Sequence, residues 1–348
     1  MDDSTIALNE LSGDQSFQHW TYDSDAQVVT ILDGADLTVT GAVSNGLRVV
    51  VDGSAAVALA GASITNTTAG AAALKLNSGA EVTLTLNQGT SNTFTGTGTA
   101  AGINVPSGAK LIIDGQGSLS ARGGNSGNAQ RGAGIGAMGA GNPAGDMDAG
   151  TIVIRGDVTV TAQGGLRGAG IGGAATRPRA GDITIAGNAT VTAVGGSYAA
   201  GIGSGPDTNG SNTGSVTITG GTVTATGGGD ILAGSAGAGI GGGVLSPGGQ
   251  VKISGGLVTA TGGFKGSGIG GGDCEPGGVT TITGGKVVAT GGGGGAGIGG
   301  GATGAGGEIE IAGGTVAATG TVAAAGAAGG AGIGGGLNRP GGVINITD

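Results

Sequence analysis

Short runs in which apolar residues alternate with threonine, serine or charged residues make up most of the chain. Typical runs are Val82 to Leu86, Lys110 to Ile113 and Ser215 to Thr219, and glycine pairs separate many of them. Because side chains on a strand point alternately to opposite faces, this pattern predicts short strands with one buried face. No stretch shows the period of an amphipathic helix. We therefore expect an all-β protein.

One element, Gly-Ala-Gly-Ile-Gly with its near-copies, recurs along the chain. Its central isoleucine returns at intervals of about 29–38 residues, and each interval also holds two alternating strands. Self-similarity at a near-constant period is typical of a repeat architecture, and three strands per period predict a coil with three faces. The recurring residues are Ile103, Ile135, Ile171, Ile202, Ile240, Ile269, Ile298 and Ile333.

Equivalent positions of successive periods carry similar residues. The inward position of the first strand is isoleucine, and the second strand carries valine or leucine followed by alanine. Such columns are what the stacked coils of a parallel β-helix require, with about 4.8 Å between coils and a rod roughly 50 Å long for about ten coils. We predict an all-β, single-stranded, three-faced parallel β-helix, right-handed because parallel crossovers have that preference. Clear examples are Ile218, Ile253 and Ile282 on the first strand, and Ala162, Ala193, Ala225 and Ala260 on the second.

Residues 1–26 differ in composition from the repeats. Phe17, His19, Trp20 and Tyr22 gather there, in a chain whose aromatic content is only 2%. The first coil of a solenoid leaves open backbone groups and an open core, so a covering segment is needed. We predict an N-terminal cap region at 1–26 and the β-helix at 27–348. The alternative for this cluster is stacking on a ligand.

The Gly-Ile-Gly strand predicts an unusual third face. Both neighbours of the inward isoleucine lack side chains, so this face is expected to be a flat ribbon of bare backbone. Such a ribbon could pack closely against a loop or a second copy of the chain, giving a homo-oligomer. It could instead receive an extended ligand.

Two stretches of these repeats resemble a known family. Gly221 to Gly228 reads Gly-Thr-Val-Thr-Ala-Thr-Gly-Gly, and Gly237 to Gly243 reads Gly-Ala-Gly-Ile-Gly-Gly-Gly. They are similar to glycine-rich repeats of large bacterial cell-surface proteins, known as carbohydrate-binding or β-helix repeats of the pectate-lyase-like solenoid group. The resemblance covers about residues 27–348. It implies a right-handed β-helix and an extracellular or cell-surface location, and it brings no catalytic motif with it.

Composition and charge exclude several functions. Glycine accounts for 91 of the 348 residues, but there is no collagen period and the alternating strands argue against disorder. The net charge of −9 argues against nucleic-acid binding. A single cysteine, Cys274, and a single histidine, His19, exclude a disulfide framework, the usual zinc sites and a Ser-His-Asp triad in the repeats. No apolar run reaches the length of a membrane span.

Three pairs of acidic residues are the candidates for catalysis or metal binding. Glu308 and Glu310 lie two apart on one strand, which places them about 6.5–7 Å apart, near the separation of an inverting glycosidase pair. The other pairs lie in loops, and two carboxylates alone are a poor calcium cage. We therefore predict no catalytic residues, no cofactor and no metal site. The loop pairs are Asp146 with Asp148 and Asp273 with Glu275.

The corner between the second strand and the Gly-Ile-Gly strand carries the candidate binding residues. Its insertions collect aromatic and basic side chains along one edge, while the opposite corner is expected to carry variable loops. Aromatic rings offer apolar contact to a sugar ring, and arginine or lysine can hold hydroxyl or acid groups. The predicted ligand-binding residues are Arg131, Arg167, Tyr198, Phe264 and Lys265.

We therefore predict a non-catalytic extracellular binding or adhesion module whose partner is a polysaccharide or another glycan, with neither nucleic acid nor membrane insertion. Three alternatives stay open. The chain could be a polysaccharide lyase or glycoside hydrolase on a β-helix, or a structural stalk. Its outward threonine columns, such as Thr159, Thr190 and Thr222, also resemble those of ice-binding proteins, although Leu257 and Lys286 interrupt them.

Overall fold

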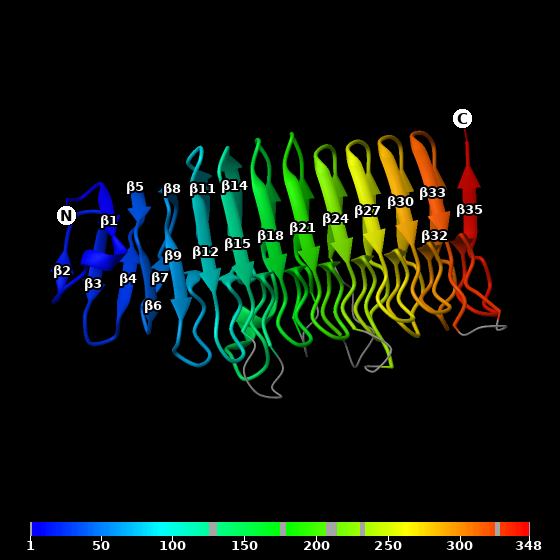
Figure 1. The fold of residues 1–348 in the computed structure, drawn as a ribbon, viewed down its shortest axis with the longest axis horizontal. Helices are drawn as coiled ribbons and strands as arrows, with labels where there is room; N and C mark the ends of the chain where they lie inside the picture. Colours follow the sequence, from blue (N-terminus) through cyan, green and yellow to red (C-terminus); the bar gives the residue numbers. More distant parts are fainter. Residues whose placement is uncertain are drawn as a thin grey trace.

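The computed structural model describes residues 2–124, 131–174, 179–206, 214–229, 234–323 and 328–347. The chain winds into an elongated rod whose two ends carry the two termini (Figure 1). Three sheets run along the rod, with 12, 13 and 10 strands, and apart from the first strands every pairing is parallel. The expected parallel β-helix is therefore confirmed.

Each coil visits the three sheets in the same order, here named sheet B, sheet A and sheet C. Two short 3-10 helices, η1 (Leu8–Glu10) and η2 (Ala144–Met147), lie outside the sheets. Sheet A contains β1 (Thr5–Ala7), β5 (Ala35–Thr40), β8 (Ala55–Leu59), β11 (Glu81–Leu86), β14 (Lys110–Gly115), β17 (Thr151–Ile154), β20 (Asp182–Ile185), β23 (Ser215–Ile218), β26 (Gln250–Ile253), β29 (Val279–Ile282), β32 (Glu308–Ile311) and β35 (Val343–Ile346).

Sheets B and C complete each coil. Sheet B contains β2 (Gln15–Ser16), β3 (Trp20–Asp23), β4 (Val28–Ile31), β7 (Arg48–Val51), β10 (Leu74–Leu76), β13 (Ile103–Asn104), β16 (Ile135–Gly136), β19 (Ile171–Gly172), β22 (Ile202–Gly203), β25 (Ile240–Gly241), β28 (Ile269–Gly270), β31 (Ile298–Gly299) and β34 (Ile333–Gly334). Sheet C contains β6 (Ala42–Asn45), β9 (Ser63–Asn66), β12 (Ser91–Thr95), β15 (Ser118–Arg122), β18 (Thr159–Gln163), β21 (Thr190–Val194), β24 (Thr222–Thr226), β27 (Leu257–Thr261), β30 (Lys286–Thr290) and β33 (Thr315–Thr319).

The core is a stack of the predicted columns. Ile218 pairs in register with Ile185 and Ile253, and Ala225 pairs with Ala193 and Ala260. All six of these residues are buried. The sequence pattern did not reveal β6 and β9, because these strands are short and polar and lie in the first, shorter coils.

The N-terminal region closes one end of the core. Strand β3 runs antiparallel to β4, and β1 already pairs with β5 as a strand of sheet A. Trp20 is fully buried, and Phe17 stacks on its ring with 4.5 Å between the ring centroids. The indole Nε1 of Trp20 donates a hydrogen bond of 3.1 Å to the backbone oxygen of Asp2. The aromatic cluster therefore packs against the core at this end of the rod.

The Gly-Ile-Gly elements do not form the bare face that the sequence suggested. Each is a strand of two residues, and the residues around it are buried. The chain bends sharply there, as shown by the hydrogen bond from Ala238 N to Gly242 O at 2.8 Å. The isoleucine lies at the tip of this bend and inserts its side chain into the core. The residues before and after it run side by side away from the core. An extended ligand or a second copy therefore cannot reach these glycines directly.

The glycine after each isoleucine is required for two reasons. Gly241 has a φ of 129°, a conformation that L side chains rarely adopt. A Cβ atom at Gly241 would also overlap the carbonyl oxygen of Gly270 in the next coil. The same holds along the rod, because Gly172, Gly203 and Gly270 meet the glycine of the following coil in the same way.

Replacing Gly241 by alanine is therefore expected to lower the free energy of unfolding by at least about 1–3 kcal/mol. Gly145 is the matched control, because its φ is not positive and a Cβ there meets no atom within 4 Å. Thermal unfolding of the two variants would measure the difference. Equal melting temperatures for Gly241→Ala and Gly145→Ala would contradict the close stacking described here.

A second prediction concerns the alanine column. Ala225 is fully buried between alanines of the neighbouring coils, so Ala225→Leu should overpack the core and cost about 1–3 kcal/mol. Thr224 points outward from the same strand and is exposed, so Thr224→Leu should change stability by less than about 0.5 kcal/mol. Chemical denaturation of both variants tests which face is inward, and a reversed order would show that the assignment is wrong.

Candidate functional site

Two rows of tight turns cover the Gly-Ile-Gly strands. The first turn row lies between sheet C and sheet B, and the second lies between sheet B and sheet A. In each turn the fourth residue donates a backbone hydrogen bond to the first, as Gly168 N does to Gly165 O at 2.8 Å. The first row includes the turns 165–168, 196–199, 263–266 and 292–295, and the second includes 243–246, 272–275, 301–304 and 336–339.

The two rows lie side by side. Val244 N in the second row donates to Tyr198 O in the first row at 2.7 Å, and Ala302 N donates to Lys265 O at 2.8 Å. Each bond joins a first-row turn to the second-row turn of the following coil. The expectation that the variable loops occupy an opposite corner is therefore wrong, because the sharp bend at each isoleucine brings both corners together. We call the combined surface the turn seam.

In seven of these eight turns the third position has positive φ, a backbone conformation that is unfavourable for most residues, and Thr303 is the exception. Arg167, Tyr198 and Lys265 stand there in the first row, with φ of 68°, 74° and 72°. A turn with positive φ at this position favours glycine, which Gly294 provides in the next turn of the same row. Apart from Gln27, every described non-glycine residue with positive φ lies in the seam. The second-row members are Leu245, Cys274 and Asn338.

The predicted aromatic and basic residues form two pairs on the first row. The guanidinium carbon of Arg167 lies 5.3 Å from the centroid of the Tyr198 ring, and Lys265 Nζ lies 5.6 Å from the centroid of the Phe264 ring. These are cation–π distances. All four side chains are partly exposed. Each pair therefore presents an aromatic ring and a cation together at the surface.

Arg131, the fifth predicted residue, differs from the other four in its burial. Arg131 stacks on the same row, since its backbone N donates to Leu166 O at 3.1 Å. However, only 6% of Arg131 is exposed, so it lies beneath the surface of the seam. The sequence placed it correctly along the rod but could not show its burial.

Asp273 ties the two rows together. Its carboxylate is almost fully buried, accepts a hydrogen bond of 2.8 Å from Ser235 Oγ, and lies 3.8 Å from Lys265 Nζ. This weak ion pair helps to hold Lys265 beside Phe264. Among the described residues, no group of three or more His, Cys, Asp or Glu side chains could hold a metal ion.

The other two acidic pairs have different surroundings. Asp146 forms an ion pair of 2.7 Å with Lys75, away from Asp148. Glu308 and Glu310 are exposed on β32, as predicted. Their in-register neighbours on β29 and β35 are uncharged, namely Val279, Val343, Thr281 and Asn345. The nearest cation in the same register column is Lys252, which lies two strands from Glu310.

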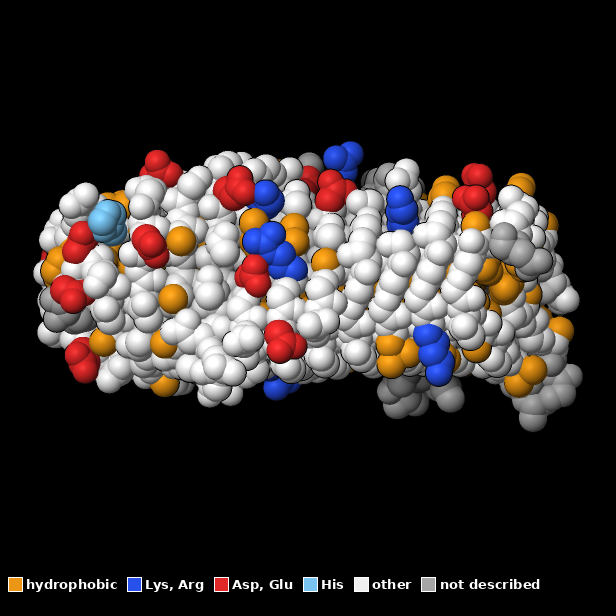
Figure 2. All heavy atoms as spheres, turned by 90° about the horizontal axis from the view of Figure 1, so that it is seen from above, with side chains coloured by type: hydrophobic (Ala, Val, Ile, Leu, Met, Phe, Trp, Pro, Cys, Tyr) orange, Lys and Arg blue, Asp and Glu red, His pale blue; other side chains and the backbone are white. Residues whose placement is uncertain are grey.

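The outward threonines of sheet C do form columns in register. The regular part spans β18, β21 and β24, where each strand presents two threonines two residues apart. Leu257 and Lys286 continue the first column and interrupt it. Seen from the edge where sheets A and C meet, the surface is mostly uncharged, with isolated acidic and basic side chains (Figure 2).

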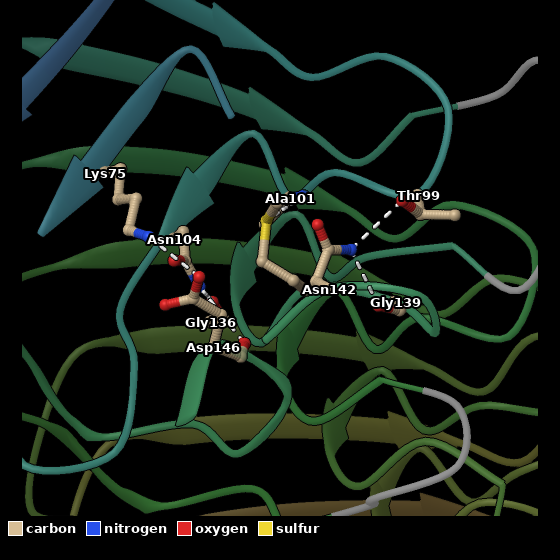
Figure 3. Close-up of polar contacts among 9 residues, drawn as sticks. Lys75, Thr99, Ala101, Asn104, Gly136, Gly139, Asn142 and Asp146 are labelled. Atoms are coloured by element: carbon tan, nitrogen blue, oxygen red, sulfur yellow. Dashed lines mark hydrogen bonds and ion pairs between the residues drawn. The ribbon is translucent and has the colours of Figure 1, made fainter. Parts of the chain in front are cut away.

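One set of polar residues was not found from the sequence. The segment 137–148 folds back over sheet B so that Asp146 reaches Lys75 of β10 (Figure 3). These two residues are separated by 71 positions, and the segment has no periodic pattern. The only signal in the sequence was its length, because it is longer than the corresponding segments of the later repeats.

Comparison with known proteins supports the fold. A family model described as a beta helix repeat matches residues 152–175, 183–206, 216–244, 251–273 and 281–302. The matches follow successive coils, and the chain is a parallel β-helix repeat protein. No curated protein and no solved structure matches it. The described part of the chain also contains no helix with the length and apolar character needed to cross a membrane.

The turn geometry can be tested at Tyr198. Tyr198→Gly is expected to keep or raise the melting temperature, because glycine adopts positive φ without the cost of about 1–2 kcal/mol that other residues carry. Tyr198→Val should lower it, since a β-branched residue is especially unfavourable at positive φ. If the glycine variant melts well below the valine variant, the described turn conformation is wrong.

Proposed function

We propose that this chain is a non-catalytic extracellular module that binds an extended polysaccharide along the turn seam. The observation that carries the proposal is the set of side chains at the strained third turn position. Arginine, tyrosine and lysine occupy places where glycine would be more stable, and such strain is commonly retained at binding sites. Loops on a rigid scaffold are also where binding residues usually lie.

The spacing of the seam suits a chain-like ligand. Successive coils stack about 4.8 Å apart, so Tyr198 and Phe264, two coils apart, repeat at roughly 10 Å along the rod. A polysaccharide lying parallel to the rod would meet the two rings in turn. Because the rings are partly exposed and flanked by cations, each pair offers an apolar contact beside a hydrogen-bond donor.

The charge of the pairs favours acidic polymers. Arg167 carries a permanent positive charge, and its planar guanidinium group can bind a carboxylate through two hydrogen bonds. The net charge of the chain is −9, so the local cations rather than the overall charge would attract the ligand. The Asp273 carboxylate of the seam contacts Ser235 and Lys265 through Oδ2, and we propose binding rather than hydrolysis for this surface.

The double variant Tyr198→Ala with Phe264→Ala tests the proposal. It should abolish retention of an acidic polysaccharide such as polygalacturonate, because each lost stacking contact removes about 0.5–1.5 kcal/mol and the contacts act on one chain. Folding should survive, since both residues lie in surface turns. Neutralising Arg167 and Lys265 should weaken binding to acidic polymers more than to neutral ones, and added salt should do the same.

Leu257→Ala is the matched control, because Leu257 is an exposed residue on the outward face of β27, outside the seam, without an aromatic ring or charge. Affinity electrophoresis in gels containing the polymer measures retention. An assay for new reducing ends, run in parallel, separates binding from cleavage. If the double aromatic variant is retained as strongly as Leu257→Ala, the seam is not the binding surface.

A further inference from the structure

A cleft lies beside the place where sheet B changes character. In the first coils sheet B has ordinary strands with outward side chains, and from β16 onwards it consists of the buried Gly-Ile-Gly elements. The segment 137–148 folds back from β16 toward β10 and leaves a cleft of about 380 Å³. Sites for small ligands have volumes of about 300–1,000 Å³, so the cleft is large enough for one.

The wall formed by segment 137–148 is held in place by specific contacts (Figure 3). Asn142 Nδ2 donates to Thr99 Oγ1 at 3.0 Å and to Gly139 O at 2.8 Å. Asn104 Nδ2 donates to Gly136 O at 3.0 Å and to Asp146 O at 3.4 Å. These bonds connect the segment to two earlier coils. The wall is therefore built before any ligand arrives.

The charges of the side chains that line the cleft do not sum to zero. Lys75 Nζ lies 2.7 Å from Asp146 Oδ2, and the Asp146 side chain is only 11% exposed. Arg48 lines the same cleft and makes no ion pair with any described residue. Two cations and one anion leave one uncompensated positive charge. A guanidinium group in this position is suited to a carboxylate or a sulfate.

The rest of the lining combines apolar surface with hydrogen-bond acceptors. Val50, Ala72 and Met138 contribute apolar groups. The amides of Asn77 and Asn142 already donate to other residues, Asn77 to Asp52 and Asn142 to Thr99 and Gly139. Among the described residues none is recorded as donating to their side-chain carbonyl oxygens, which can therefore accept from hydroxyl groups. Apolar patches with donors and acceptors around one cation match the surface of an anionic sugar.

We propose that this cleft binds a single sugar unit carrying one negative charge, as a carboxylate or a sulfate. Arg48 would pair with the anionic group, Lys75 and Asp146 would bind hydroxyl groups, and the apolar residues would contact the ring. The site shares no residue with the turn seam. The proposal for the cleft can therefore be tested independently of the function proposed for the seam.

Titration of the isotope-labelled full chain, followed by NMR shifts of backbone amides around the cleft, tests the proposal. The probes are D-glucuronate, glucose 6-sulfate and uncharged D-glucose. At least one anionic sugar should bind, and glucose should bind roughly tenfold more weakly or not at all, as expected for the loss of one charge-assisted pair. The relative strength of the two anionic probes distinguishes carboxylate from sulfate recognition. Binding of neither anionic sugar would overturn the proposal.

Two variants test the roles of the charges. Arg48→Gln should weaken binding of the anionic sugar about tenfold, whereas Lys252→Gln, which removes an exposed cation from β26, should leave it unchanged. Equal affinity for Arg48→Gln and the unmodified chain would overturn the assignment. The seam double variant should keep this binding even if it loses the polysaccharide.

Discussion

The close approach of glycine backbones between successive coils is the constraint on which the rest of the rod depends. At Gly241 and its equivalents, a side chain is excluded both by positive φ and by the carbonyl oxygen of the next coil. Because these positions must be glycine, the chain can bend sharply there and insert only the isoleucine into the core. The bend in turn brings the two turn rows together and buries the third face. The wide use of glycine in this chain therefore reflects geometry more than flexibility.

This constraint also determines where chemistry can be placed. Sheets A and C supply columns that are uniform because neighbouring coils pack against them, and the Gly-Ile-Gly elements have no side chains to offer. The central residues of the turns and the outward positions of sheets A and C are the places that vary between coils. Aromatic and basic side chains have accumulated at these positions in the first row, despite the cost of positive φ at the third one.

The sequence allowed the fold to be predicted because every coil repeats the same burial pattern. The isoleucine and alanine columns and the alignment of Tyr198 with Phe264 on one edge all follow from counting residues between repeats. The third face was predicted wrongly, because the alternation rule assumes an extended strand and cannot show a bend such as the one closed by Ala238 and Gly242. The cleft was missed for a related reason. Lys75 and Asp146 meet only through the fold of an irregular segment, which leaves no periodic trace.

The hydrogen bonds described between the two turn rows join backbone atoms, and the ion pair of Lys265 with Asp273 adds one side-chain contact. Val244 contributes its N–H group and Tyr198 its carbonyl oxygen, and the same holds for Ala302 with Lys265. The packing of the scaffold beneath the turns therefore depends little on which side chains the turns carry. A mutation in one turn changes what is displayed at a single point along the rod and leaves its neighbours in place. Such a surface can diversify during evolution one coil at a time, because a change in one turn does not require changes in the others.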